Sequence, residues 1–330
     1  MKKGLLLVMV LLITFSMSAQ LFAGGQQEAE DDGITILFMP GVADPFYYMM
    51  EKGIREKGAE LGVNIIVAEF PKAWGPEVQV PILEATVAQG GIDMILIAPT
   101  AIDALISPLK KLYDQGIEII TVDTFLGNGD YSVDSDYSFP LSYIGSDNEK
   151  GGREMAAHLA EMVGEKGKVY INSTNPDVSS VMGRVKGFKE GLEAFPDMEL
   201  VGIDYNMDVQ QKATDQTLGA LQKDPDIVGI FGTNLYSSQG AYQAVVNAGL
   251  SGAVKLATWD ASVDIINALK KGQIDLCLAQ KPYEIGSLAV EWGYKFLSAG
   301  TKIPAKVIPG FEFFNEGNVN DPEMDKFIYK

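Results

Sequence analysis

Eight residues have side chains that suit the capture of a small polar molecule, and each lies just after a short apolar segment. Three are aromatic and can cover the apolar face of a compact ligand. Five are carboxylates or amides that exchange hydrogen bonds with its edge. The mixture suits a neutral molecule rich in hydroxyl groups, because each hydroxyl both donates and accepts. The residues are Phe46, Tyr47, Trp259, Asp44, Asp123, Asn234, Asp260 and Gln280.

Each of these residues also has an ordinary structural explanation. Asp and Asn after a strand are favoured as turn formers and helix caps, and Asp44-Pro45 has the sequence of an N-cap followed by a first-turn proline. Trp259 and Phe46 could equally belong to the core. The ligand interpretation is favoured because polar groups and rings recur at the same end of nearly every expected strand.

Composition excludes most metal and nucleophile chemistry. The chain has one histidine, His158, and one cysteine, Cys277, whereas zinc sites need three or four Cys, His or carboxylate ligands. The glycine-containing motifs of serine hydrolases, dinucleotide-binding proteins and phosphate-binding loops are missing from the sequence. We therefore expect no catalytic residue, no metal and no cofactor. A glycoside-processing enzyme built on paired carboxylates such as Asp44 and Asp260 is the disfavoured alternative.

The net charge argues against nucleic acid as a partner. The chain has 26 Lys and Arg against 44 Asp and Glu, which gives a net charge of −18. A surface of this sign repels phosphate backbones, and the lysines do not gather into a stripe. The 330 residues, 47% of them hydrophobic, are typical of a globular protein of about two domains.

The first residues have the features of a secretory signal. Lys2 and Lys3 precede an apolar run, and small residues follow, so we expect residues 1–23 to be removed by cleavage near Ala23. Residues 24–32 then form a polar, flexible tether, and the mature chain is expected in the periplasm as a monomer. An uncleaved membrane anchor is disfavoured because the run is shorter than the ~20 residues that span a bilayer.

From residue 33 onward, short apolar runs alternate with amphipathic segments of helical length. Near-continuous apolar strands separated by helices are typical of parallel sheets covered on both faces, and this number of strands fits two sheets better than one. We expect an α/β protein with two doubly wound parallel-sheet lobes. The expected strands are 34–39, 64–69, 93–98, 117–122, 168–172, 199–204, 227–231, 254–258 and 274–279. Expected helices include 46–61, 101–115, 149–163, 182–194, 210–223, 237–248, 263–271 and 283–299.

The order of these elements indicates where a ligand binds. Open α/β sheets bind ligands outside the carboxyl ends of their strands. If two sheets turn those edges toward each other, the eight polar and aromatic residues line one cleft.

The sequence resembles the periplasmic sugar-binding proteins of ABC importers, of the ribose-binding type (type I periplasmic binding proteins). The similarity extends over residues 33–309 and is carried by short motifs in the family's order. They are Asp44-Pro45-Phe46-Tyr47, Ile97-Ala98-Pro99-Thr100, Ile120-Thr121-Val122-Asp123, Ile144-Gly145-Ser146-Asp147-Asn148 with Gly151-Gly152, Arg184-Val185-Lys186-Gly187-Phe188, Phe231-Gly232-Thr233-Asn234, Trp259-Asp260 and Ala279-Gln280-Lys281-Pro282.

The resemblance implies two lobes joined by a three-segment hinge, with crossings near 146–147, 280–281 and 310–311. Residues 33–146 and 281–310 would form the N-terminal lobe, and residues 147–280 and 311–330 the C-terminal lobe. It also implies closure around one sugar or polyol, delivery to an ABC transporter permease, and no chemical reaction. The eight residues named at the outset would contact the ligand, with Phe46 and Trp259 on either side of its ring.

Two positions depart from the ribose-binding pattern. Thr124 and Met182, which we include among the candidate ligand-binding residues, stand where ribose-binding proteins carry arginine. Without those two bidentate donors, another pentose, a hexose, a polyol or a cationic ligand is favoured over ribose. Arg184 is expected to brace the start of its helix. Trp74 is expected either to pack within its own loop or to add a ring at the mouth of the cleft.

A sensor is the alternative within the same fold. A periplasmic protein of this kind can present its ligand to a chemotaxis or other signalling receptor instead of a permease, and both partners would recognise the closed lobes. A sugar-sensing repressor core is disfavoured, because an export signal stands where the DNA-binding helices would be.

Overall fold

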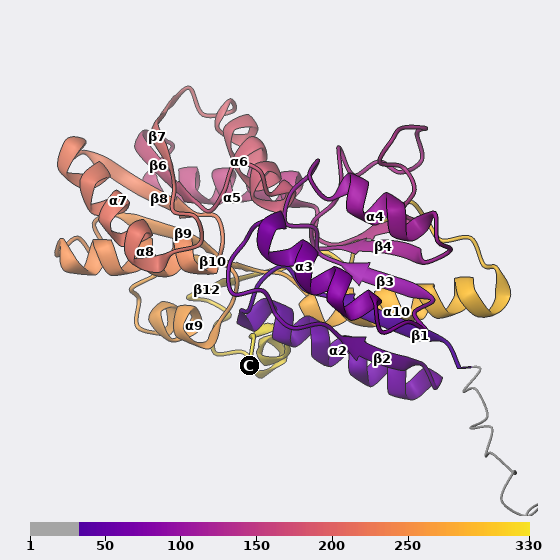
Figure 1. Ribbon diagram of the computed structural model, residues 1–330. Coiled ribbons are helices and arrows are strands. Elements are labelled where there is room, and N and C mark those ends of the chain that lie inside the picture. The colour runs from indigo at the N-terminus through magenta and orange to yellow at the C-terminus, as the bar shows by residue number, and fades with distance from the viewer. Residues whose placement is uncertain (1–32) are drawn as a thin grey trace, which may run out of the picture. The chain divides into compact units, whose positions relative to one another are not determined.

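Two six-stranded sheets organise the computed structural model, which describes residues 33–330 (Figure 1). The first sheet has the order β11-β5-β4-β3-β1-β2, and all its strands are parallel. Its strands are β1 (Thr35–Met39), β2 (Asn64–Val67), β3 (Met94–Ile97), β4 (Glu118–Val122), β5 (Ser142–Ile144) and β11 (Lys306–Val307).

The second sheet repeats this plan with the order β12-β10-β9-β8-β6-β7. Its edge strand β12 pairs antiparallel with β10, and the other pairs are parallel. The strands are β6 (Lys166–Ser173), β7 (Asp197–Tyr205), β8 (Ile227–Gly232), β9 (Lys255–Trp259), β10 (Leu276–Ala279) and β12 (Glu312–Asn315). The prediction of two doubly wound sheets is confirmed.

Helices connect most of the strands, as is usual between parallel strands, while β4 and β5 are joined by a long loop. The helices are α2 (Pro45–Leu61), α3 (Pro76–Val87), α4 (Ile106–Tyr113), α5 (Asn148–Val163), α6 (Ser179–Leu192), α7 (Gln210–Lys223), α8 (Leu235–Asn247), α9 (Val263–Lys270), α10 (Pro282–Ala299) and the short 3₁₀ helix η1 (Pro322–Phe327). The expected helices did not include α3, which contains Pro81 and has little amphipathic character. Proline removes a backbone donor, so this segment lacks the usual helical signal.

The chain passes between the two sheets three times: after β5, after β10 and after β11. Although α10 follows a strand of the second sheet, it packs against α2 beside the first. The two helices approach so closely that a Cβ atom on Gly53 would lie 2.1 Å from the Tyr283 carbonyl oxygen. The expected three-segment hinge is therefore present, while the exact lobe boundaries stay a prediction.

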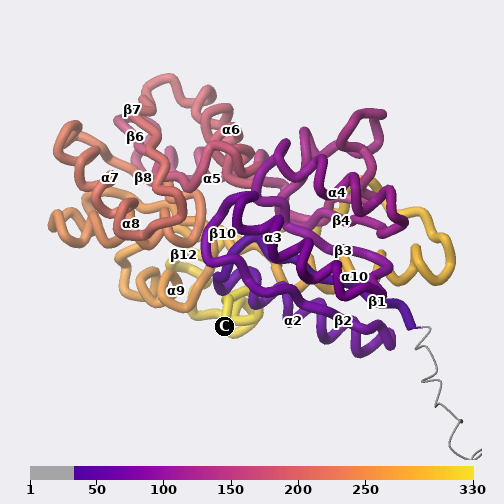
Figure 2. The backbone as a smooth tube through the Cα atoms, viewed as in Figure 1, coloured from indigo at the N-terminus to yellow at the C-terminus, as the bar shows by residue number. Residues whose placement is uncertain are grey.

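The C-terminal segment lies between α9 and α2 (Figure 2) and contacts residues in both halves of the chain. The Tyr329 amide donates to the Ala261 carbonyl in the second sheet's half of the chain, at 2.9 Å. The Tyr329 ring meets Phe46 of α2 edge to face, with 5.9 Å between ring centroids. Residues 311–330 were expected to lie in the C-terminal lobe, and the sequence did not indicate that they would also contact α2.

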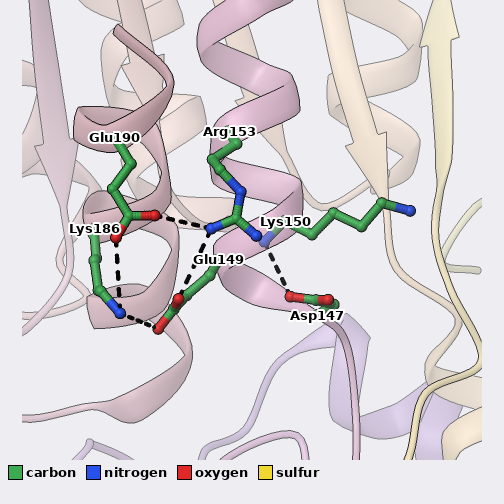
Figure 3. Close-up of polar contacts among 6 residues, drawn as sticks. All are labelled: Asp147, Glu149, Lys150, Arg153, Lys186 and Glu190. Atoms are coloured by element: carbon green, nitrogen blue, oxygen red, sulfur yellow. Dashed lines mark hydrogen bonds and ion pairs between the residues drawn. The ribbon is translucent and has the colours of Figure 1, made fainter. Parts of the chain in front are cut away.

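An ion network joins α5 and α6 at the surface (Figure 3). Arg153 pairs with Glu190 at 2.9 Å and with Glu149 at 3.8 Å. Lys186 pairs with the same two carboxylates, at 2.8 Å to Glu149 and 3.8 Å to Glu190. At the start of α5, the Asp147 side chain accepts from the Lys150 amide and caps the helix.

None of the helices within residues 33–330 is both long enough and apolar enough to cross a membrane. The predicted signal peptide and tether, residues 1–23 and 24–32, lie outside the described residues.

Candidate functional site

Residues from both sheets line one narrow cavity at the carboxyl ends of the strands. The cavity is small: the centre of a water-sized sphere can occupy about 30 Å³ of it. Seven of the predicted ligand-binding residues line it: Asp44, Phe46, Tyr47, Asp123, Asn234, Asp260 and Gln280. The other lining residues are Trp74, Thr174, Val178, Ser180, Val181 and Arg184.

Asp123 and Asp260 occupy matching places in the two sheets. Asp123 follows β4 and Asp260 follows β9, and both have a left-handed backbone, with φ of 60° and 74°. Their amides still continue the sheets, because Asp123 donates to Ile144 at 3.0 Å and Asp260 to Leu278 at 2.9 Å. A positive φ is unfavourable for a non-glycine residue and is often found at functional sites. The strand ends thus hold two carboxylates at the cavity.

Asp123 has a buried oxygen without a protein partner. Its Oδ2 accepts from the Tyr47 hydroxyl at 2.7 Å, but among the described residues nothing bonds to its buried Oδ1. Burial raises the pKa of Asp123 to about 6, against the opposing effects of Arg184 and the Tyr47 hydrogen bond. The buried Thr174 hydroxyl also lacks a partner in this part of the chain. An unpaired buried polar group costs about 1–3 kcal/mol, so both atoms favour a ligand that bonds to them.

Asp260 and Gln280 form a fixed polar network. Asp260 Oδ1 accepts from Gln280 Nε2 at 2.8 Å, and its Oδ2 accepts from the Leu235 amide at 3.1 Å. Gln280 Oε1 accepts from the Ser146 hydroxyl at 2.8 Å. Tyr329 completes the network, because its hydroxyl accepts from the Gln280 amide at 2.9 Å and donates to Asp260 at 3.3 Å. These bonds fix the orientation of both side chains on the cavity wall.

Asp44 and Asn234 also cap helices, as their ordinary explanation predicts. Asp44 Oδ1 accepts from the Tyr47 amide at the start of α2, and Asn234 Oδ1 accepts from the Ser237 amide at the start of α8. The same side chains line the cavity. Capping fixes their rotamers, and it leaves Asp44 Oδ2 and the Asn234 amide nitrogen for other contacts.

Arg184 provides the cationic side chain of the lining. It is 3% exposed and donates to Asn148 Oδ1 at the start of α5 and to the Thr233 carbonyl, both at 2.8 Å. These bonds suit the expected bracing role, but the pattern of residues did not indicate that Arg184 also lines the cavity. The positive charge of Arg184 acts to lower the pKa of Asp123 and of Asp260, but burial outweighs it and raises the pKa of both carboxyl groups. Burial also raises the pKa of Asp44 and of Asp208.

Three predicted residues do not line the cavity. Trp259 is fully buried, and the Arg184 guanidinium lies over its ring at 4.4 Å, so the arginine covers the face that was expected to stack on a sugar. The Thr124 hydroxyl donates to the Pro99 carbonyl at 2.8 Å within the protein. Met182 is 41% exposed and lines a separate surface groove with Asn175. A direct ligand contact by any of the three stays a prediction.

The structure places Trp74 at the cavity and adds Asp208 beside it. The Trp74 indole nitrogen donates to Asp208 Oδ2 at 3.1 Å, and Asn234 Nδ2 donates to Asp208 Oδ1 at 2.7 Å. Trp74 therefore follows the second of its two expected placements, at the cleft. Asp208 lies just after β7, a strand-end position that could have marked it as a candidate.

A larger groove lies at the hinge, between α2, the start of α10 and the C-terminal residues. It measures about 900 Å³ and shares Gln280 with the smaller cavity. We prefer the smaller cavity as the candidate site, because two buried polar atoms that lack partners among the described residues, Asp123 Oδ1 and the Thr174 hydroxyl, belong to residues that line it.

Comparisons with known proteins agree with this architecture. The sequence model of the periplasmic binding protein domain matches residues 33–302. A ribose import binding protein from Haemophilus influenzae is 28% identical over 264 residues, which cover 80% of this chain and 85% of that protein.

Solved structures show the same relationship. An ABC transporter solute-binding protein from Agrobacterium vitis, bound with alpha-D-tagatopyranose, is 41% identical and has a TM-score of 0.87 over 90% of this chain and 99% of that one. A second such protein from Agrobacterium vitis, with bound D-fucose, is 25% identical and has a TM-score of 0.82 over 90% of this chain and 100% of that one. These relatives are named for binding a solute, not for catalysis. The chain thus belongs to the periplasmic binding protein domain family, and its predicted likeness to the sugar-binding proteins of ABC importers is confirmed.

Proposed function

We propose that this protein binds a single neutral sugar or polyol in the cavity between its two sheets and delivers it to the permease of an ABC importer. The observation that carries the proposal is the unpaired, buried Asp123 Oδ1 at the cavity, which a ligand hydroxyl would satisfy. The Thr174 hydroxyl, also buried and unpaired, supports it.

The charge of the site limits the class of ligand. Asp44, Asp123 and Asp260 line the cavity with one guanidinium, that of Arg184. An anionic ligand would meet strong repulsion, whereas sugar hydroxyls can donate to the carboxylates and accept from the arginine. Hydrogen bonds to charged groups contribute about 1.5–3 kcal/mol each, so a few of them suffice for tight binding.

We favour a hexose over ribose. Thr124 and Met182 replace the arginines expected of ribose-binding proteins, and in this structure neither side chain lines the cavity. The relative that is 41% identical was solved with a ketohexose, alpha-D-tagatopyranose. A hexose such as tagatose also offers more hydroxyls to the acidic lining than a pentose does.

Export to the periplasm is part of the proposal. Residues 1–23 would act as the signal, cleaved near Ala23, and residues 24–32 would tether the folded part. The mature protein would act as a monomer, present the bound ligand to the permease and release it unchanged.

A thermal-shift screen followed by calorimetry tests the proposal. We expect D-tagatose, D-fucose or another hexose to raise the melting temperature more than D-ribose, polyols or the diamine putrescine do, since a ligand of the folded state stabilises it. Asp123→Ala should lower the affinity for the best ligand by about 10–100-fold, because it removes a charged acceptor. The control Asp226→Asn changes an exposed carboxylate that pairs with Lys168 and should keep normal affinity. Binding of putrescine alone, or of no sugar or polyol at all, would refute the proposal.

A further inference from the structure

The solvent side of the cavity is formed by a small group of side chains. Of the thirteen lining residues, ten are buried, and only Asp44, Trp74 and Asn234 are partly exposed. Asp208 is also partly exposed and bonds to two of them. These residues mark the mouth of the cavity, where a ligand enters.

The hydrogen bond from Trp74 to Asp208 joins the two halves of the protein. Trp74 lies in the loop before α3, beside the first sheet, while Asp208 follows β7 of the second sheet. The bond therefore exists only while the two halves are together. Asn234, at the start of α8, belongs to the same half of the protein as Asp208 and donates to the other oxygen of its carboxylate.

Asp208 is presented by a tightly held turn. Met207 and Asp208 both have positive φ, 57° and 64°, a backbone conformation that is uncommon for residues other than glycine. The turn is fixed by the fully buried Asn206, whose side-chain nitrogen donates to Asn172 Oδ1 and to the Ser237 hydroxyl, each at 2.7 Å. The Met207 amide also donates to the Thr174 carbonyl at 2.7 Å. Such anchoring keeps the carboxylate aimed at the opposite half.

Trp74 is held by close packing on its own side. Its ring meets Tyr47 edge to face with 6.2 Å between centroids. The ring fits there because residue 41 is glycine: a Cβ atom on Gly41 would lie 2.6 Å from the Trp74 ring. The indole nitrogen therefore faces Asp208 from a fixed position.

We propose that Trp74 and Asp208 form a latch over the mouth, which makes the site selective for a single, unsubstituted sugar ring. This inference rests on the proposed function. A ligand contained within the cavity lets the indole reach the carboxylate. A substituent that projects through the mouth separates them, so the complex loses a charge-assisted hydrogen bond. Because the bond spans the two halves, it chiefly slows dissociation.

Two substitutions of Trp74 separate the hydrogen bond from the bulk of the ring. The ligand is the best sugar of the screen, used unmodified and as its set of mono-O-methyl derivatives, each methylated at one ring position. Trp74→Phe keeps an aromatic ring and loses the donor, and we expect its dissociation rate for the unmodified sugar to rise about tenfold with little change in association rate. Asp208→Ala should raise the dissociation rate similarly.

Trp74→Ala also opens the mouth. We expect it to bind the derivative whose methyl group projects through the mouth at least tenfold more tightly than wild type does, while derivatives methylated at inward positions stay rejected. Trp292→Phe is the matched control, because Trp292 packs beside the first sheet and does not line the cavity. The latch would be overturned, with the proposed function still standing, by unchanged dissociation rates in both Trp74→Phe and Asp208→Ala. The same conclusion would follow if Trp74→Ala bound no methylated derivative more tightly than wild type does. Failure of wild type to bind any sugar would overturn the proposed function and the latch with it.

Discussion

Tyr329→Phe tests whether the end of the chain supports the ligand site. The substitution removes one oxygen that accepts from the Gln280 amide at 2.9 Å and donates to Asp260 at 3.3 Å. It keeps the ring, so the edge-to-face contact with Phe46 remains. Asp260 also keeps its two other donors, Gln280 and the Leu235 amide.

The magnitude follows from the burial of the groups left behind. Gln280 is 1% exposed, so its backbone N–H would lose its acceptor in a place that water does not reach. An unsatisfied buried donor costs about 1–3 kcal/mol, and the longer bond to Asp260 adds about 1 kcal/mol or less. We therefore expect the free energy of unfolding to fall by about 2–3 kcal/mol. Ligand affinity should fall by less than about tenfold, because Ser146 and Asp260 still hold the Gln280 side chain.

Urea unfolding followed by circular dichroism measures the effect, and calorimetry measures the affinity. The control Tyr242→Phe removes a hydroxyl that donates to Gln273 at 2.9 Å in a partly exposed pair, where water can replace it. That variant should lose about 1 kcal/mol or less. Equal losses in the two variants, or no loss in Tyr329→Phe, would show that Tyr329 does not support the site in this way.

Three further predictions concern pH, helix packing and surface charge. The pKa of Asp123 and of Asp208 is raised to about 6, so between about pH 4 and 6 the folded protein binds more protons than the unfolded chain. Urea titrations of the free protein should show stability rising as pH falls from 7 to about 4.5, while calorimetry shows sugar affinity falling; the opposite trends would contradict these assignments. Gly53→Ala should lower the free energy of unfolding by several kcal/mol, because its Cβ atom would meet a backbone oxygen at 2.1 Å, whereas Gly219→Ala, with nothing within 4 Å, should raise it by about 0.5–1 kcal/mol. Arg153→Ala, in the network of Figure 3, should cost about 1 kcal/mol or less in urea unfolding, because its side chain is 43% exposed; a much larger loss would refute this.

Some site residues could be predicted because their placement is local. Asp123, Asp260 and Gln280 each come directly after a buried apolar strand, and parallel sheets bring such positions to one edge. The type of fold follows from the same pattern, since strands such as β3, Met94–Ile97, are buried at every residue.

Other residues could not be assigned because the choice depends on which way an element faces. Met182 and Arg184 lie two positions apart on α6, and residues two apart on a helix point to nearly opposite sides. Only the packing of α6 decides that Arg184 turns inward, 3% exposed, and Met182 outward. Trp259 and Asp260 are neighbours at the end of a strand, and the tryptophan turns into the core beneath Arg184.

The sequence by itself determined the two wound sheets, the edge where the site forms and the acidic character of that edge. These features depend on the spacing of apolar residues along the chain and on the types of a few neighbouring side chains. Only the tertiary structure decided that Trp74 meets Asp208 and that Tyr329 supports Gln280. Each pair joins segments far apart in the chain, and their contact depends on how helices and loops pack together, which no local pattern specifies.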